Sequence, residues 1–421
     1  MTKYFLILLL TLTNLLFASS REETLNRIRE LLSSLPEGTK AGVVIYDPLI
    51  QDTILSFNAN IPMIPASITK LFTVATSFGV MNGDHKLSTK FFSDDLNLKD
   101  GILNGNLYIK GYGNSTFTQS DLQDMINYLL HIGIKKITGN IIGDDTYFDN
   151  IYTREDWIED EQANVKLPPI SALVLDRNRT TIKKKIRRRF RFITEAIKDP
   201  PLFIANKLKQ ELISSGIEVK GTAQKGVTPN NAMFITETYI KLKDLVALIN
   251  KHSDNFLAEC LFKTLGAEAS GLQGNSFFSQ QAIQKFLRDN NIYSTGTEIV
   301  DGSGISRFDQ ATPLAINGVL EKMYFDLVHF NDFYNSLSVA GVDGTLRGRL
   351  EGTLAENNFR GKTGSLNGVS GLAGYLTDKN GDDLIITIIF QFNKGGTSYY
   401  RSIQDQIVTL LTEWEKGNSD Q

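Results

Sequence analysis

The amino-acid sequence predicts an α+β fold with an antiparallel sheet assembled from both ends of the chain. A helix and two short strands are expected near the start, and two strands and a helix near the end. Mostly helical sequence and a long insert of different character lie between them. The simplest arrangement is one sheet built from the terminal strands. The terminal helices and a helical subdomain would then cover the apolar faces of this sheet.

The first elements follow from hydrophobic spacing. Apolar residues recur every three or four positions in residues 21–35, which predicts an amphipathic helix. Residues 41–46 form a short apolar run typical of a buried strand, and residues 53–57 predict its hairpin partner. Residues 67–80 again show helical spacing.

The character of the sequence changes between residues 84 and 235. Short β-type runs at 106–110 and 139–142 alternate with turns rich in Gly, Asn and Asp, around one helical stretch at 120–130. This pattern predicts an inserted β-rich module.

Regular periodicity returns after the insert. Residues 241–265 show helical spacing. Two strands at 369–376 and 384–392 are joined by a turn that contains Asn380-Gly381, a strong hairpin signal. A last helix is expected at 401–414.

Composition excludes several classes of protein. The chain has 421 residues, 41% of them apolar, and a net charge of −3, so a dedicated nucleic-acid binder is not expected. A single cysteine, Cys260, excludes an intrachain disulfide and a thiolate zinc cluster. The four histidines are too scattered for a metalloprotease motif. We therefore expect no metal and no other cofactor.

The N-terminus has the layout of a secretory signal peptide. Lys3 precedes an apolar run that continues to Phe17, and Ala18 and Ser20 place small residues before a cleavage point after Ser20. A retained membrane anchor is the alternative, because the run is close to the shortest span of a bilayer. The expected division of the chain is a signal peptide (1–20), one domain in two parts (21–83 and 236–421) and the insert (84–235).

Three short motifs carry the chemistry. They are Ser67-Ile68-Thr69-Lys70, Ser253-Asp254-Asn255 and Lys362-Thr363-Gly364-Ser365. Together they match the S-x-x-K, S-x-N and K-T-G set of penicillin-recognising serine enzymes. Each alone has an ordinary interpretation as a helix cap, a solvated lysine or a turn, but their order and their placement on the expected elements make a chance coincidence improbable.

The motifs predict a nucleophile with a lysine base. Ser67 and Lys70 are three residues apart at the start of a helix, so their side chains share a face. A lysine accepts the serine proton only if its pKa falls through burial or a neighbouring cation, and Lys362 is expected to supply that cation. Gly364 lacks a side chain that could block a peptide pairing with the strand edge, while Ser253 and Asn255 can relay a proton and hold an amide.

Further segments resemble one known family, the D-alanyl-D-alanine carboxypeptidases/endopeptidases among the class C low-molecular-mass penicillin-binding proteins. Residues 301–307 (DGSGISR) look like its DGSGLSR segment, and residues 339–346 (VAGVDGTL) look like its AGxDGTL segment. Residues 360–366 (RGKTGSL) with 371–375 (GLAGY) are similar to its RGKTGSL…LAGY segment. The resemblance covers most of residues 40–395.

The resemblance implies the serine β-lactamase/DD-peptidase fold and a role for each motif residue. Ser67 would be the acylated nucleophile and Lys70 its base. The remaining assignments are proton transfer and substrate holding (Ser253, Asn255), substrate binding (Lys362, Thr363, Gly364, Ser365), an oxyanion hole (the amides of Ser67 and Ser365) and looser substrate contacts (Arg307, Asp144).

One segment departs from the family pattern. After residues 173–178 the family usually continues with a long β-rich stretch, whereas this chain passes almost directly to residues 200–205, so the insert is shortened. The shortened region contains a basic stretch, Lys183 to Arg191. It is interpreted as a solvated strand or loop face, with attraction to anionic envelope polymers or lipid head groups as the alternative.

The resulting expectation is a periplasmic serine-type D-Ala-D-Ala carboxypeptidase/endopeptidase that acts on peptidoglycan stem peptides and is acylated by β-lactams. A β-lactamase or esterase on the same fold, or a non-catalytic peptidoglycan-binding homologue, are the alternatives. A homodimer is compatible with the sequence, and no nucleic-acid partner is expected.

Overall fold

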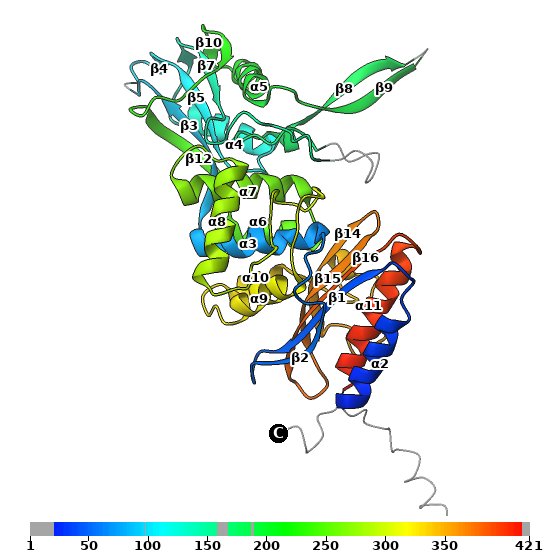
Figure 1. Ribbon diagram of the computed structural model, residues 1–421. Helices are drawn as coiled ribbons and strands as arrows, with labels where there is room; N and C mark the ends of the chain where they lie inside the picture. Colours follow the sequence, from blue (N-terminus) through cyan, green and yellow to red (C-terminus); the bar gives the residue numbers. More distant parts are fainter. Residues whose placement is uncertain (1–20, 97, 158–166, 187–188, 415–421) are drawn as a thin grey trace, which may run out of the picture.

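The computed structural model describes residues 21–96, 98–157, 167–186 and 189–414 (Figure 1). It is a mixed α+β structure, which confirms the predicted fold class. The predicted signal peptide, residues 1–20, lies outside the described residues. In the described part, no helix is both long and apolar enough to cross a membrane.

The central sheet joins the two ends of the chain, as the sequence predicts. Its six strands lie in the order β13-β14-β15-β16-β1-β2, and every pair is antiparallel. Strands β1 and β16 pair directly, with Val43 opposite Ile388. The strands are β1 (Lys40–Asp47), β2 (Asp52–Phe57), β13 (Ser338–Val339), β14 (Phe359–Leu366), β15 (Val369–Thr377) and β16 (Asp383–Gln391).

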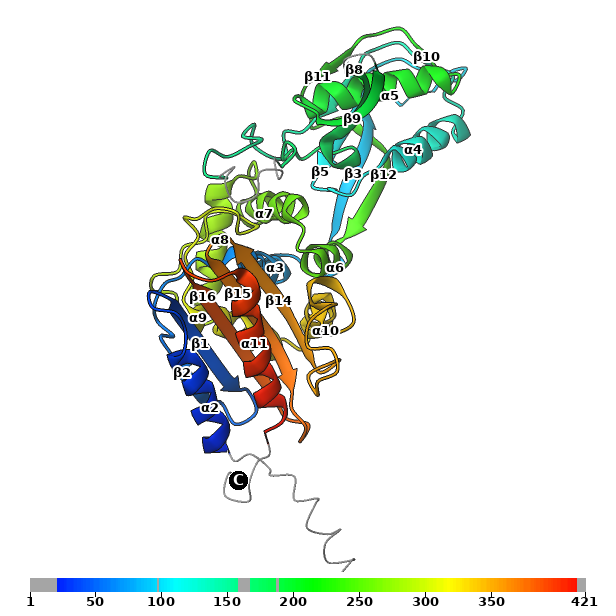
Figure 2. The ribbon, with the colours of Figure 1, turned by 90° about the vertical axis from the view of Figure 1, so that its right-hand side faces the viewer.

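The two faces of this sheet pack against different helices. Helices α2 (Arg21–Ser33) and α11 (Thr397–Thr412) cover one face side by side (Figure 2). Along β16, Ile386 and Ile388 join this terminal-helix core, whereas Ile385 and Ile389 join the core of the helical subdomain. Side chains alternate between the faces of a strand, so one apolar strand builds both cores.

The helical subdomain covers the other face. It contains a 3₁₀ turn η1 (Ala66–Ile68), α3 (Thr69–Val80), α6 (Leu242–His252), α7 (Asn255–Ser270), α8 (Ser276–Asp289), α9 (Pro313–Tyr324) and α10 (Phe330–Ser336). The helical spacing expected at 241–265 is present as two helices, because Ser253 adopts a left-handed conformation (φ 52°) that ends α6. The Asp254 carboxylate then accepts the Leu257 N–H and caps α7.

The insert has its own core and sheets. Its main sheet has the order β11-β7-β5-β3-β12 and mixes parallel and antiparallel pairs. The strands are β3 (Lys86–Ser93), β5 (Leu107–Tyr112), β7 (Ile141–Asp144), β11 (Ala223–Lys225) and β12 (Met233–Lys241). Two helices, α4 (Gln119–His131) and α5 (Pro200–Ser214), share its core, together with a small sheet of β4 (Ile102–Leu103), β6 (Lys136–Ile137) and β10 (Glu218–Val219). Strand β12 pairs with β3 as far as Lys241, past the boundary expected at 235.

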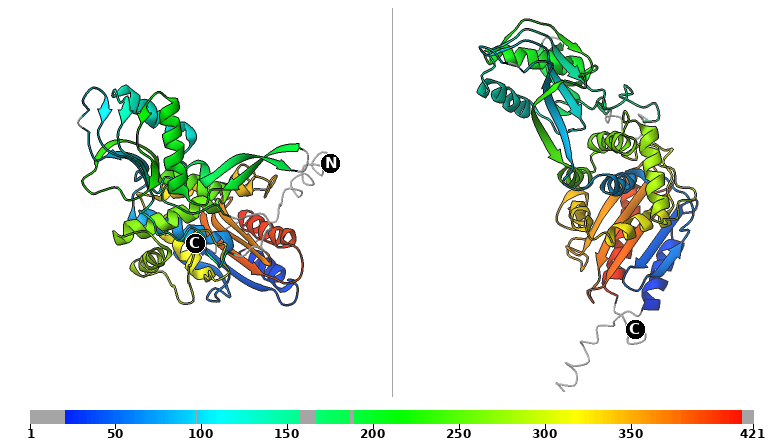
Figure 3. Two further views of the ribbon diagram at one scale, coloured as in Figure 1. Left: turned by 90° about the horizontal axis from the view of Figure 1, so that it is seen from above. Right: turned by 90° about the vertical axis from the view of Figure 1, so that its left-hand side faces the viewer.

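A separate hairpin leaves the insert. Strands β8 (Arg179–Ile186) and β9 (Arg189–Ala196) pair only with each other among the described strands. Figures 1 and 3 show this hairpin as an arm that extends away from the body of the insert.

Candidate active site

Ser67 lies in a tight turn at the entrance of α3. Ala66 precedes it with a positive φ of 50°, which starts the 3₁₀ turn that α3 continues. A non-glycine residue in this region is strained, and such strain persists only where the surroundings enforce it. The turn is enforced by close packing, because a Cβ on Gly304 would lie 1.9 Å from the Ala66 carbonyl oxygen. Ser67 itself is half-buried.

Lys70 lies one turn further along the same helical segment and is fully buried, with 0% exposure. Its Nζ lies 2.9 Å from Ser67 Oγ, 2.7 Å from Asn255 Oδ1 and 2.6 Å from the Ser303 carbonyl oxygen. A charged lysine has three N–H donors, so these three neighbours account for all of them. A neutral Lys70 amine has two N–H donors, and if it donates these to Asn255 and the Ser303 carbonyl oxygen, its lone pair faces Ser67 Oγ.

Burial is the main cause that shifts the Lys70 amine toward its neutral form. It lowers the pKa of Lys70 from 10.5 to about 8, although the carboxylates of Asp301 and Glu259 oppose this shift. Of the two causes that the sequence left open, burial or a neighbouring cation, burial is the larger. Burial, followed by the charge of Lys70, lowers the pKa of Lys362 well below 10.5.

The second motif enters the site at the break between α6 and α7. Ser253 occupies the left-handed position that ends α6, and its Oγ accepts a 2.8 Å hydrogen bond from Lys362 Nζ. Asn255 is the first residue of α7, and its Oδ1 accepts from Lys70. The two residues therefore contact different lysines, because the helix break turns one side chain toward β14 and the other toward α3.

The third motif lies on β14, the strand that precedes β15. Strand β13 pairs with one edge of β14 only at Arg360 and Gly361, whereas β15 pairs with the opposite edge along the whole of β14. The Thr363 hydroxyl donates to Thr345 Oγ1 at 2.9 Å. Lys362 is fully buried, whereas Thr363 is half-buried.

Gly364 has a packing role in addition to the one predicted. A Cβ at this position would lie 2.6 Å from the Pro65 carbonyl oxygen and 3.3 Å from the Ile68 nitrogen. The missing side chain therefore lets β14 approach the Ser67 turn, and does not merely clear a path for substrate. This approach is the reason the first and third motifs share one site.

Ser365 and Arg307 lie at the far end of β14. Ser365 is exposed and opposite Ser370 on β15. Arg307 donates from Nη2 to the Asn367 carbonyl oxygen at 2.9 Å, in the turn that joins β14 to β15. The structure thus brings Arg307 next to the third motif.

Asp144 is not brought into this cluster. It is 0% exposed at the end of β7, where its carboxylate pairs with Lys110 and accepts from Thr146 and Thr228. Burial alone would raise its pKa, but these hydrogen bonds outweigh burial and lower it. This carboxylate is therefore buried and paired within the insert.

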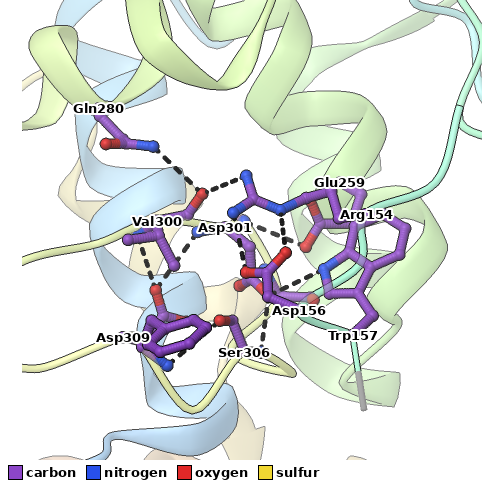
Figure 4. A network of polar contacts seen from close by, with 12 residues as sticks. Arg154, Asp156, Trp157, Glu259, Gln280, Val300, Asp301, Ser306 and Asp309 are labelled. Atoms are coloured by element: carbon purple, nitrogen blue, oxygen red, sulfur yellow. Dashed lines mark hydrogen bonds and ion pairs between the residues drawn. The ribbon is translucent and has the colours of Figure 1, made fainter. Parts of the chain in front are cut away.

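A buried carboxylate network supports the loop that contacts Lys70 (Figure 4). Asp301 accepts backbone N–H bonds from Ser303, Gly304 and Ser306 at 2.6 to 3.1 Å. These bonds fix the loop so that the Ser303 carbonyl oxygen faces Lys70. Trp157, from the insert, donates its indole N–H to Asp301 at 3.1 Å. One segment of the insert is thereby attached to the wall of the site.

Two other acids of this network hold their protons more tightly than usual. Burial, reinforced by the charge of Asp301, raises the pKa of Glu259 to about 8. The same causes raise the pKa of Asp309 well above its usual value. The charges of Asp301 and Glu259 raise the pKa of Lys70, so the network partly offsets the burial that lowers it.

Several residues of the site were not assigned roles from the sequence. Thr345, Ser303 and Asp301 lie in segments that the family resemblance includes, so that resemblance was the available signal. Glu259 and Trp157 stand in no recognisable motif. Their contacts arise only when α7 and the insert pack against the 301–309 loop.

Comparison with known proteins identifies the family of this chain. The sequence profile of the D-Ala-D-Ala carboxypeptidase 3 (S13) family matches residues 24–189 and 187–414. The chain is 25% identical to a D-alanyl-D-alanine carboxypeptidase of Actinomadura sp. (strain R39), over 90% of this chain and 82% of that protein. It is 24% identical to the D-alanyl-D-alanine carboxypeptidase DacB of Haemophilus influenzae, over 84% and 86% of the two chains.

A solved structure shows the same fold. The crystal structure of penicillin binding protein 4 (dacB) from Haemophilus influenzae superposes with a TM-score of 0.80 at 22% identity, over 93% of this chain and 99% of that one. The same protein complexed with a β-lactam superposes with a TM-score of 0.77. The family profile covers nearly all of the described residues, and this chain therefore belongs to the D-Ala-D-Ala carboxypeptidase 3 (S13) family of serine peptidases.

Proposed function

We propose that the chain is a serine-type D-Ala-D-Ala carboxypeptidase/endopeptidase that acts through an acyl-enzyme on Ser67. The observation that carries this proposal is the 2.9 Å contact between Ser67 Oγ and a fully buried Lys70 amine. A serine hydroxyl needs an adjacent base, and a lysine acts as that base only when it is neutral. Burial provides this condition by lowering the pKa of Lys70 to about 8.

The reaction has two steps. In acylation, Lys70 Nζ accepts the Ser67 proton while Oγ attacks the carbonyl carbon of the D-alanyl peptide bond, and the leaving amine takes a proton as the bond breaks. The amides of Ser67 and Ser365 would hold the developing oxyanion, which the close approach of β14 to the Ser67 turn supports. Water then attacks the ester, releases the shortened peptide and regenerates the serine.

The second and third motifs would hold the substrate and move its proton. Asn255 and Ser253 each contact one of the two buried amines, so a proton can pass between the lysines and the leaving amine through Ser253. Thr363 provides a hydroxyl on β14, in the part that β13 leaves unpaired. Arg307 provides a guanidinium near the turn that follows β14. These groups suit a substrate that ends in a carboxylate.

Peptidoglycan stem peptides are the proposed substrate and β-lactams the proposed covalent inhibitors, in a periplasmic enzyme of the class C low-molecular-mass group. The names of the relatives support the peptide specificity, and the β-lactam complex of the Haemophilus influenzae protein supports the inhibition. The shortened insert leaves both free pentapeptides and cross-linked peptides as candidates.

The test uses a fluorescent penicillin together with purified muropeptides. Wild-type protein should label covalently on the tryptic peptide that contains Ser67, and Ser67→Ala should not label. Ser402→Ala, on the exposed surface of α11, is the matched control and should label normally. Mass spectrometry of monomeric and cross-linked muropeptides should show loss of D-Ala or cleavage of the cross-link.

Two results would contradict the proposal. Labelling of Ser67→Ala would place the nucleophile elsewhere. Rapid penicillin turnover without any muropeptide cleavage would favour a β-lactamase or esterase, and cleavage of neither substrate would favour a non-catalytic peptidoglycan-binding protein.

A further inference from the structure

The β8–β9 hairpin is the structural feature that the proposed catalysis does not use. It forms a two-stranded sheet of its own and extends from the insert as an arm (Figures 1 and 3). The two segments of the family match, 24–189 and 187–414, meet at the connection between its strands. The arm is therefore located where the chain departs from the continuous family pattern.

The sequence of this arm is strongly basic, in contrast to the rest of the chain. Residues 179–196 contain eight Lys or Arg residues and a single acidic residue, Glu195, whereas the whole chain has a net charge of −3. Glu195 forms an ion pair with Lys184 at 3.4 Å. So large a positive excess on one projecting element creates a local field that attracts anionic surfaces.

The strand register places aromatic and cationic side chains together. Lys183 lies opposite Phe192 and Lys185 lies opposite Phe190, so these four residues share one face of the hairpin. The phenylalanines are 77% (Phe192) and 63% (Phe190) exposed. Lys183 Nζ lies 5.0 Å from the centre of the Phe190 ring. The face is thus apolar and cationic at the same time.

This combination fits the interface of an anionic bilayer better than a soluble polyanion. Lysines and arginines can pair with lipid phosphates, while phenylalanine rings enter the boundary between head groups and acyl chains. A soluble anionic polymer would satisfy the cations but leave two phenylalanine rings exposed to water. A projecting arm can also reach a flat surface that the body of the insert would otherwise hold at a distance.

We propose that the face formed by Lys183, Lys185, Phe190 and Phe192 docks the protein on a membrane surface rich in anionic phospholipid. The proposal does not depend on the peptidase activity, since none of these residues contacts the Ser67 cluster.

The test is vesicle flotation with the full mature chain. Vesicles of phosphatidylcholine containing about 30% phosphatidylglycerol should bind the protein at least about tenfold more strongly than pure phosphatidylcholine. Salt at about 0.5 M should weaken this binding, because it screens the charge attraction. The double variants Lys183→Ser/Lys185→Ser and Phe190→Ser/Phe192→Ser should each reduce binding several-fold.

A matched control separates docking from general surface effects. Phe277 and Lys285 are exposed on α8, so Phe277→Ser/Lys285→Ser changes the same residue types elsewhere and should bind as wild type does. Penicillin labelling and thermal unfolding should be unchanged in both hairpin variants, which shows that any loss of binding is not unfolding.

Three outcomes would overturn the proposal. The first is equal binding to the two kinds of vesicle. The second is full vesicle binding by Phe190→Ser/Phe192→Ser, because the rings would then be irrelevant. The third is binding to purified peptidoglycan sacculi, lost in the lysine variant, with no binding to vesicles, which would assign the face to a cell-wall polymer.

Discussion

Acylation of Ser67 should depend on pH through the buried amine of Lys70. The burial of Lys70 lowers its pKa to about 8, so the lysine loses its proton in the range where the protein is easily assayed. Only the neutral amine can accept the Ser67 proton, so the acylation rate should rise with pH and level off above the pKa. This sign is opposite to that expected if a protonated lysine assisted the reaction.

The magnitude follows from the position of the pKa. With a pKa of about 8, about one lysine in eleven is neutral at about pH 7 and about ten in eleven at about pH 9. The acylation rate should therefore rise about tenfold over this interval and change little above it. A lysine with an ordinary pKa of 10.5 would instead give about a hundredfold rise with no plateau at about pH 9.

The assay is the second-order rate constant of labelling by a fluorescent penicillin, measured across this range with a buffer of constant ionic strength. Lys70→Arg is the control, because it keeps a cation of similar length that does not become neutral, and it should label at least about a hundredfold more slowly at every pH. A flat profile in the wild type, or a rate that still rises tenfold per unit at about pH 9, would refute the assignment of Lys70 as a base with a lowered pKa.

Three further substitutions test other parts of the site. Gly364→Ala places a Cβ 2.6 Å from the Pro65 carbonyl oxygen, so β14 must move away from the nucleophile, and penicillin labelling should slow at least about tenfold. Thr345→Val removes the acceptor of the Thr363 hydroxyl, which should raise KM for a D-Ala-D-Ala peptide several-fold with little change in thermal unfolding. Trp157→Phe removes one donor from the buried carboxylate network and should lower the free energy of unfolding by about 1–2 kcal/mol in a denaturant titration.

Local sequence patterns were sufficient for much of the fold. The apolar run at residues 384–392 predicts a strand, and in the structure its side chains point alternately to the two faces, so Ile386 and Ile389 join two different cores. In residues 241–265 the apolar spacing continues across Ser253, although the structure has two helices there. The spacing does not reveal that this residue adopts a positive φ and divides the helix in two.

For the site too, local spacing predicted some contacts, and others depended on the tertiary structure. The spacing of Ser67 and Lys70 predicted their contact, since a serine and a lysine three positions apart share a helix face whatever the rest of the chain does. Asp144, chosen by a loose alignment, is instead buried among partners in the insert, because its ion pair with Lys110 depends on strand pairing between β5 and β7.

The sequence by itself determined the family, the terminal-strand sheet and the residue types of the nucleophile and base, because these depend on local spacing and on short motifs. Only the tertiary structure decided the pKa of the Lys70 amine and the hydrogen bonds that position it. The burial of Lys70, the Ser303 carbonyl oxygen that contacts it and the acids Glu259 and Asp309 near the loop come from three separate segments, α3, α7 and residues 301–309. A pKa depends on the solvent and charge that surround a group in space, and no spacing along the chain specifies those surroundings.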